Sequence, residues 1–144
     1  MILSFSTTEF TEFSESFLNL KMIGSELTEK IIGEAIFVHR NLGPGLLEST
    51  YETCLFHRLI KAGLSVEKEK PMPVFFDGVR LDCGYRLDLV VEDSVVLELK
   101  SVKKLREIHL AQMITYLKLG GYQTGLLMNF NVLRLVDGIK RVKV

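Results

Sequence analysis

Three charged residues stand in a stretch that otherwise has the pattern of two β-strands. Asp88, Glu98 and Lys100 lie in "LDCGYRLDLVVEDSVVLELKSV", residues 81–102, where a buried carboxylate would be costly. Two carboxylates held together repel each other unless a cation lies close by. A hard divalent ion such as Mg²⁺ binds one or two carboxylates and keeps several waters. Such an ion polarises a phosphoryl oxygen and acidifies a bound water, and a nearby ammonium offsets charge that develops at the phosphate.

Alternation along the two strands predicts which of these side chains share a face. Successive side chains of a strand point to opposite faces. The odd-numbered residues of 81–89 are Leu, Cys or Tyr, whereas Asp88 is one of the even-numbered residues that carry the charges. On the second strand, Glu98 and Lys100 share a face. A hairpin would therefore bring the three charged residues together. The alternative is a cross-strand set of ion pairs on a solvated sheet face.

Two helices should precede these strands. The chain predicts helices over residues 24–43 and 46–63, separated by Gly43-Pro44-Gly45, with Ser25 or Thr28 as the first N-cap. Apolar residues at three- and four-residue steps mark the buried face of each helix. These residues are Leu27, Ile31, Ala35 and Val38 on the first helix, and Leu47, Tyr51, Cys54, Leu55 and Leu59 on the second.

The remaining elements alternate between strands and one helix. Residues 64–76 form a charged strand that ends at the turn signal Asp77-Gly78, before the strands described above. A helix over 105–121, a buried strand over 123–130 and a terminal hairpin about Asp137-Gly138 follow. The fold class is therefore α/β (or α+β), with a central mixed sheet flanked by helices.

Length and composition limit the number of domains and the class of protein. A chain of 144 residues is the size of one domain, and we expect residues 1–22 to form an N-terminal extension and 23–144 the domain itself. The net charge of zero excludes an overall basic coat but permits a local basic patch. No apolar run reaches membrane-spanning length, and Cys54 and Cys83 lack the spacing of a metal site. We expect a cytoplasmic protein with reduced thiols.

Two further motifs lie on the predicted helices. Glu48 falls in a G-x-x-E-x-x-Y pattern that begins at Gly45, and Gln112 and Tyr116 form a Q-x-x-x-Y pattern. With Asp88 and the Glu98-Leu99-Lys100 triplet, these residues resemble the core of PD-(D/E)XK nucleases, although Leu87 stands where that motif has Pro. The sequence from about Leu27 to the C-terminus is most similar to the small bacterial GxxExxY protein family. This resemblance implies a restriction-endonuclease-like core of order αβββαβ.

The resemblance also implies a role for each motif residue. Glu48, Asp88 and Glu98 would be ligands of Mg²⁺ (or Mn²⁺), with Glu48 binding directly or through water. Lys100 would position the attacking water and stabilise the charged phosphate. Gln112 would orient Lys100 or contact the scissile phosphate. The expected catalytic set is therefore Glu48, Asp88, Glu98, Lys100 and Gln112.

A wider set of residues is expected to contact substrate: Tyr116, His39, His109, Arg86, Lys103 and Lys104. Tyr116 would lie at the rim of the site, and the basic residues would face a polyphosphate. A structural role is the alternative for each histidine, and an intramolecular ion pair is the alternative for Arg86.

The leading hypothesis is a metal-dependent nuclease that cleaves nucleic acid by metal-activated water, with DNA as the first candidate substrate. The second is a catalytically inactive nucleic-acid-binding or regulatory module on a nuclease fold. The third is an interaction protein. The small size of the domain favours a homodimer, and nothing in the sequence indicates a membrane partner.

Overall fold

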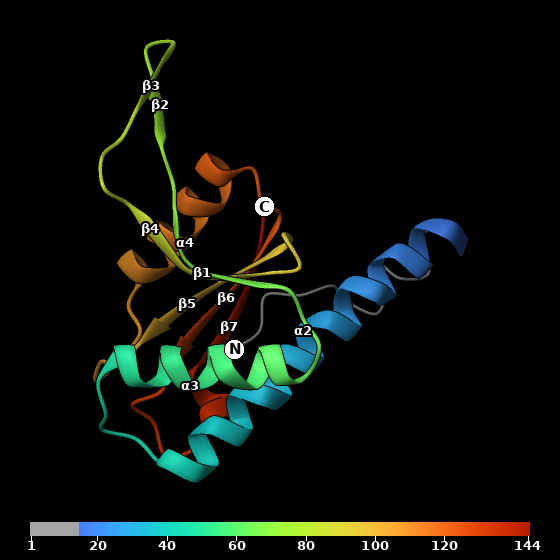
Figure 1. Ribbon diagram of the computed structural model, residues 1–144, viewed down its shortest axis with the longest axis vertical. Coiled ribbons are helices and arrows are strands. Elements are labelled where there is room, and N and C mark those ends of the chain that lie inside the picture. Colours follow the sequence, from blue (N-terminus) through green and yellow to red (C-terminus); the bar gives the residue numbers. More distant parts are fainter. Residues whose placement is uncertain (1–14) are drawn as a thin grey trace.

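The computed structural model describes the backbone of residues 15–144 and the side chains from Glu26 onward. A five-stranded sheet carries helices on both of its faces (Figure 1). The mixed α/β fold predicted from the sequence is therefore confirmed. The first part of the expected N-terminal extension, residues 1–14, lies outside the described residues.

Three α-helices are present in the described part of the chain: α2 (Glu15–Leu42), α3 (Glu48–Lys61) and α4 (Glu107–Gly120). The second and third lie close to their predicted bounds. The first begins well before the predicted start, so it crosses the expected domain boundary at residue 22. Ser25 and Thr28 consequently lie inside α2 and are not its N-caps. Leu47 was predicted to be buried but is 74% exposed, because α3 begins only after it.

The central sheet has the strand order β1-β4-β5-β6-β7. Its strands are β1 (Val66–Pro71), β4 (Arg86–Val91), β5 (Val95–Lys100), β6 (Thr124–Asn129) and β7 (Ile139–Lys143). Strand β5 pairs with β6 in parallel through the crossover helix α4, and the other neighbouring strands are antiparallel. The predicted buried strand over 123–130 corresponds to β6.

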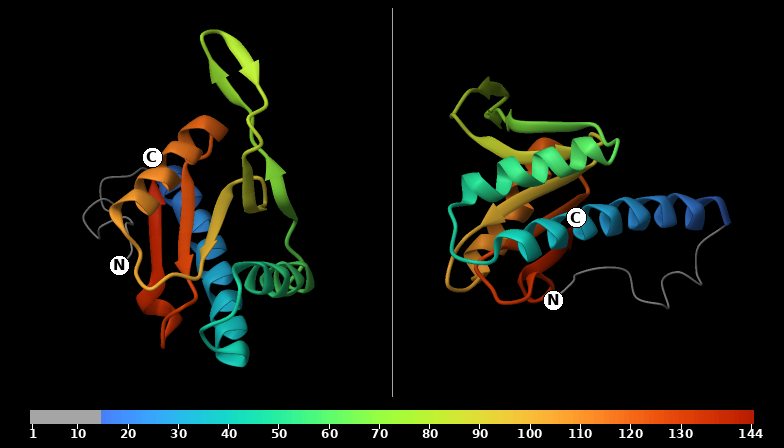
Figure 2. Two further views of the ribbon diagram at one scale, coloured as in Figure 1. Left: turned by 90° about the vertical axis from the view of Figure 1, so that its left-hand side faces the viewer. Right: turned by 60° about the horizontal axis from the view of Figure 1, so that its bottom comes forward.

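The chain between β1 and β4 differs from the prediction. Instead of one long strand on each side of Asp77-Gly78, the residues form a separate hairpin of β2 (Val74–Phe76) and β3 (Val79–Leu81). This hairpin projects away from the sheet (Figures 1 and 2). The turn signal was read correctly, but it closes the projecting hairpin rather than joining two strands of the central sheet.

The predicted terminal hairpin is wrong. Residues before Asp137-Gly138 are bends and a 3₁₀ helix, η1 (Leu135–Gly138), and β7 pairs with β6 instead. Leu135 is buried, and a Cβ atom at Gly138 would collide with the backbone oxygen of Asn129. Close packing of this corner therefore replaces a strand with a compact turn.

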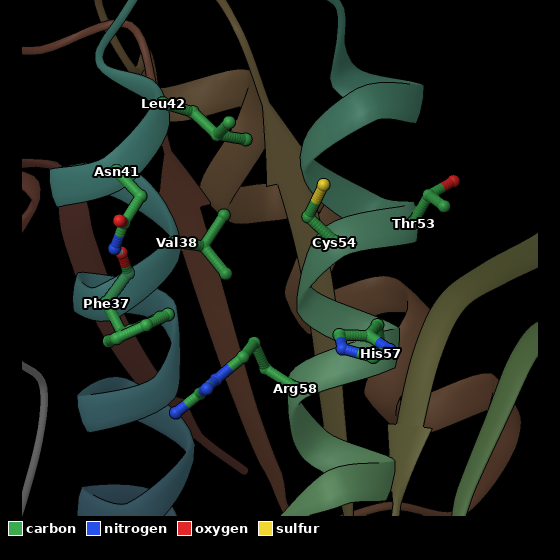
Figure 3. A pocket seen from close by; sticks show the side chains of 8 residues that line it. All are labelled: Phe37, Val38, Asn41, Leu42, Thr53, Cys54, His57 and Arg58. Carbon is green, nitrogen blue, oxygen red and sulfur yellow. Dashed lines mark hydrogen bonds between the residues drawn. The ribbon is translucent and has the colours of Figure 1, made fainter.

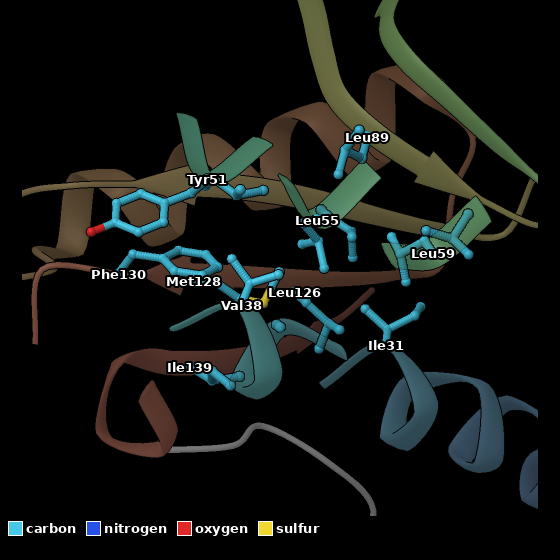
Figure 4. Packing of buried hydrophobic residues seen from close by; sticks show 14 of the residues in the cluster. Ile31, Val38, Tyr51, Leu55, Leu59, Leu89, Leu126, Met128, Phe130 and Ile139 are labelled. Carbon is cyan, nitrogen blue, oxygen red and sulfur yellow. The ribbon is translucent and has the colours of Figure 1, made fainter. Parts of the chain in front are cut away.

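Each face of the sheet has its own hydrophobic cluster. The cluster under α2 and α3 includes Ile31, Tyr51, Leu55 and Phe130 (Figure 4). Tyr51 is fully buried and stacks on Phe130 with ring centroids 4.5 Å apart. The cluster under α4 includes residues of α4 and of the strands: Met113, Leu117, Val90, Val96 and Leu127. Within the described residues, no helix has the length and apolar character needed to cross a membrane.

Candidate active site

The pairing of β4 with β5 is interrupted at Asp88. Cα partners are found from Leu89 and Leu97 onward, toward the turn, but not at Asp88. Leu87 belongs to the cluster under α4, whereas Leu89 belongs to the cluster under α2 and α3. An ideal strand would place both leucines on one face. The simple alternation predicted for this strand therefore fails at the residue that carries the candidate chemistry.

The two carboxylates take the place of backbone acceptors at this interruption. The backbone N–H of Leu99 donates to Oδ2 of Asp88 at 2.8 Å, and the backbone N–H of Asp88 donates to Oε1 of Glu98 at 3.3 Å. Each strand thus uses a side chain of the other to satisfy a donor that a regular ladder would pair with a carbonyl. Asp88 and Glu98 are held beside each other as the sequence predicts.

Burial raises the pKa of both acids. Burial first, and then the charge of Asp88, raises the pKa of Glu98 to about 8. Burial also raises the pKa of Asp88, against the hydrogen bond from the backbone N–H of Leu99. The charge of Lys100, two positions after Glu98 on β5, acts to lower the pKa of both acids. Glu98 is only 7% exposed, which does not fit a solvated set of ion pairs.

Glu48 lies at the start of α3 and is exposed. Its Oε1 accepts a hydrogen bond from the backbone N–H of Ser101 at 3.2 Å, and the Ser101 hydroxyl donates to the carbonyl oxygen of Leu46 at 2.8 Å. The beginning of α3 is therefore attached to the residue that follows β5. The charge of Glu48 also acts to raise the pKa of Asp88.

Helix α4 brings Gln112 and Tyr116 toward the pair from the other face of the sheet. The Gln112 amide donates to the Tyr116 hydroxyl at 3.1 Å. Burial raises the pKa of Tyr116, and the charge of Glu98 raises it further. The ring of Tyr116 also lies 5.8 Å from the ring of Tyr85, between centroids. Tyr116 is thus near both the acids and the base of the projecting hairpin.

The two histidines make local structural contacts. His39 is buried, and its Nε2 lies 3.1 Å from the carbonyl oxygen of Phe130 and 2.8 Å from that of Val132. The backbone N–H of Arg106 donates to Nδ1 of His109 at 2.9 Å, at the start of α4. Both placements favour the structural alternative over a substrate contact.

The predicted basic contacts are exposed. Arg86 opens β4, two positions before Asp88, and its Nη1 donates to the carbonyl oxygen of Tyr85 at 3.2 Å. Lys103 and Lys104 follow β5 and line a pocket of about 210 Å³ together with Lys140. These side chains are accessible to a polyanion, whereas His39 is buried and His109 is half-buried.

Glu52 is the acid that sequence reasoning missed. It lies one turn after Glu48 on α3, is only 9% exposed, and its Oε1 has no hydrogen-bond partner among the described residues. Burial, followed by the charge of Asp88, raises the pKa of Glu52 to about 7. A signal existed in the sequence, because Glu52 falls on the same helical stripe as Leu55 and Leu59.

No three His, Cys, Asp or Glu side chains within the described part of the chain stand close enough together to hold a metal ion. The three ligands implied by the resemblance are therefore not assembled into a finished carboxylate centre. A pocket of about 560 Å³ is lined by Glu48 and Ser101. Another of about 560 Å³ lies between α2 and α3, lined by Phe37, Leu42 and Cys54 among others, and contains none of the residues predicted for the site (Figure 3).

Comparison with known proteins agrees with this geometry. A family model described as the PD-(D/E)XK nuclease superfamily matches residues 25–142. No curated protein and no solved structure matches the chain significantly. The matched region contains both strands of the carboxylate pair, the acids of α3 and the polar residues of α4. The chain therefore belongs to the PD-(D/E)XK nuclease superfamily.

Proposed function

We propose that this protein is a Mg²⁺- or Mn²⁺-dependent nuclease that hydrolyses the phosphodiester backbone of nucleic acid, with DNA as the first candidate substrate. The observation that carries this proposal is the pair of Asp88 and Glu98, held side by side across an interrupted ladder, with Lys100 two positions after Glu98 on β5. Membership of the superfamily supports the same reaction class.

The residues present fit a hard divalent cation by their chemistry. Asp88 and Glu98 are neighbouring carboxylates whose pKa values are raised by burial, and Glu52 adds a buried oxygen without a partner among the described residues. Mg²⁺ is commonly bound by one or two carboxylates and several waters, so a pair of ligands suffices. When bound, the ion would supply Lewis-acid chemistry at the phosphate. The resemblance adds an acid from α3, for which it names Glu48.

The other residues of the site have roles that follow from their positions. The Lys100 ammonium, whose charge acts on both carboxylates, would orient the attacking water and stabilise negative charge at the phosphate. Gln112 and Tyr116 would form the opposite wall, where the Gln112 amide can donate to Lys100's water or to a phosphate oxygen. The exposed side chains of Arg86, Lys103 and Lys104 would contact phosphates along the strand.

The test is cleavage of labelled single- and double-stranded DNA and RNA with Mg²⁺, with Mn²⁺ and with EDTA. Wild type should cut at least one substrate only with a divalent ion. Asp88→Asn and Lys100→Ala should each lower the rate about 100-fold or more, because the first removes a proposed ligand of the cation and the second removes a positive charge that would act at the phosphate. Asp82→Asn is the matched control, since Asp82 is exposed and accepts from the backbone N–H of Gly84 within a local turn.

Two results would contradict the proposal: no cleavage of any of the four substrates, or cleavage by Asp88→Asn at the wild-type rate. Divalent-independent binding of nucleic acid without cleavage would instead identify the inactive binding module. Asp82→Asn should cut like wild type, so a loss there would show that the assay reports folding rather than the site.

Three further parts of the proposal concern the subfamily, the cellular location and the oligomeric state of the protein. We place it in the GxxExxY branch of the superfamily, in the cytoplasm and as a homodimer. Free Cys54 and Cys83 are consistent with a reducing compartment. Light scattering on the purified protein tests the dimer directly.

A further inference from the structure

Helix α3 presents two glutamates to the same side, one turn apart. Glu48 and Glu52 are spaced i, i+4, so their side chains lie one above the other on the helix. Their environments differ, because Glu48 is exposed whereas Glu52 is buried under the sheet-facing side of α3. Glu48 and Glu52 are therefore alternative candidates for the acid that α3 contributes to the site. The sequence motif alone does not distinguish between them.

Glu48 already has a structural partner. Its Oε1 accepts from the backbone N–H of Ser101 at 3.2 Å, and the neighbouring contact from the Ser101 hydroxyl to Leu46 joins the same two segments. Together these hydrogen bonds fasten the start of α3 to the end of β5. The carboxylate of Glu48 thus satisfies the backbone donor of Ser101 in this turn.

Glu52 differs from Glu48 in its hydrogen bonding and burial. Its Oε1 is buried and has no hydrogen-bond partner among the described residues. An unpaired buried carboxylate is costly and usually loses its charge or acquires a cation. Among the described residues, Oε1 of Glu52 makes no hydrogen bond that would account for a carboxylate at this buried position.

The charged groups that act on the pKa of Glu52 are mostly acids. The charges acting on it come from Asp88 of β4, Glu69 and Lys68 of β1, and Glu48 of its own helix. Asp88 contributes the largest of these. Lys68 is the one cation in this group, and its ammonium also donates to the Thr53 hydroxyl at 3.4 Å. The carboxylate of Glu52, with its buried and unpartnered Oε1, therefore experiences an excess of negative charge, to which Asp88 contributes most.

We propose that Glu52, rather than Glu48, is the α3 carboxylate that binds the divalent cation together with Asp88, and that Glu48 fastens α3 to the end of β5. This inference rests on the proposed metal-dependent function. It assigns the unpartnered oxygen of Glu52 to the cation and explains why a carboxylate is kept at a buried helical position.

The test is Mn²⁺ binding by isothermal titration calorimetry on the full chain, with no substrate present. Glu52→Gln keeps the size of the side chain and removes its charge, and should weaken Mn²⁺ binding at least tenfold. The matched variant Glu48→Gln, one turn away, should change the dissociation constant less than threefold. Asp88→Asn should abolish measurable binding. Circular dichroism of each variant checks the fold, and Glu52→Ala provides a second variant at the same position.

The outcomes are distinct. If wild type binds Mn²⁺ and cleaves nucleic acid but Glu52→Gln and Glu52→Ala bind as tightly as wild type, the role of Glu52 is wrong and the proposed function stands. The same holds if Glu48→Gln causes the larger loss. If wild type binds no Mn²⁺, the metal-dependent function and the role of Glu52 both fail.

Discussion

At the scale of single residues, the candidate site depends on carboxylates that do two things at once. Asp88 and Glu98 each accept a hydrogen bond from the backbone of the opposite strand, which fixes their positions without any bound ion. Each carboxylate has a second oxygen, and every oxygen has more than one lone pair. A preorganised pair of this kind would meet a cation with little rearrangement.

The raised pKa values predict how stability depends on pH in the metal-free protein. The pKa of Glu98 is about 8 and that of Glu52 about 7, both above their ordinary value of 4.5. Between pH 4.5 and pH 8 the folded chain therefore binds more protons than the unfolded chain. The contribution of these acids to the free energy of unfolding is complete below pH 4.5 and is lost as pH rises toward 8.

Chemical denaturation in EDTA at pH 5 and at pH 8.5 measures this effect. Glu98→Gln should reduce the loss of stability between the two pH values by on the order of 2 kcal/mol relative to wild type. Groups remote from the site contribute equally to both proteins, so the difference reports the interacting pair of Glu98 and Asp88. An identical pH dependence in wild type and Glu98→Gln would contradict the raised pKa.

At the scale of elements, the loop between α2 and α3 fixes where the acids of α3 lie. Gly43 and Gly45 both have positive φ angles, 75° and 93°, which favour glycine. The Tyr51 hydroxyl donates to the carbonyl oxygen of Gly43 at 2.6 Å and accepts from the backbone N–H of Leu46 at 3.1 Å. The glycine and tyrosine of the G-x-x-E-x-x-Y motif are thus explained by the loop, separately from any role of its glutamate.

Tyr51→Phe should destabilise the protein by about 1–2 kcal/mol, because it leaves the backbone groups of Gly43 and Leu46 without their partner. Urea denaturation followed by circular dichroism provides the measurement. Tyr85→Phe is the control, since Tyr85 is 44% exposed, and should change stability by less than about 0.5 kcal/mol. Equal stability of Tyr51→Phe and wild type would show that the hydroxyl does not hold the loop.

Local patterns predicted those elements whose ends carry local signals. Helix α4 ends at Gly121, a left-handed residue with φ of 75°, and α3 begins after the Gly-Pro-Gly turn, so both were predicted closely. The projecting hairpin and η1 were missed. Their conformations depend on which strand pairs with β1 and β6, and pairing between distant segments leaves little trace in a local pattern.

The site likewise combines features that a local pattern predicts with features that depend on packing between distant segments. The neighbourhood of Asp88, Glu98 and Lys100 followed from spacing, because a hairpin brings its two strands together. The interruption at Asp88 did not, since it appears only when Leu87 and Leu89 pack on opposite faces of the sheet. Glu52 was missed because its burial arises from the packing of α3 on the sheet, although its place on the apolar stripe was readable.

At the scale of the whole molecule, the site lies where the two layers of the fold meet at one edge of the β4–β5 pair. Helix α3 approaches from one face with its acids, and α4 from the other with Gln112 and Tyr116. Each layer has its own hydrophobic cluster, through which its helix packs against the sheet. The two layers thereby position groups from both faces around one pair of carboxylates.

The most direct test of the central claim, that the pair of Asp88 and Glu98 is a divalent-cation site, is a crystal soaked in Mn²⁺ and measured for anomalous scattering. We predict a single strong anomalous peak in contact with the carboxylates of Asp88 and Glu98, which disappears in crystals of Asp88→Asn. A map without a peak at these carboxylates, while Mn²⁺ is bound elsewhere or nowhere, would contradict it.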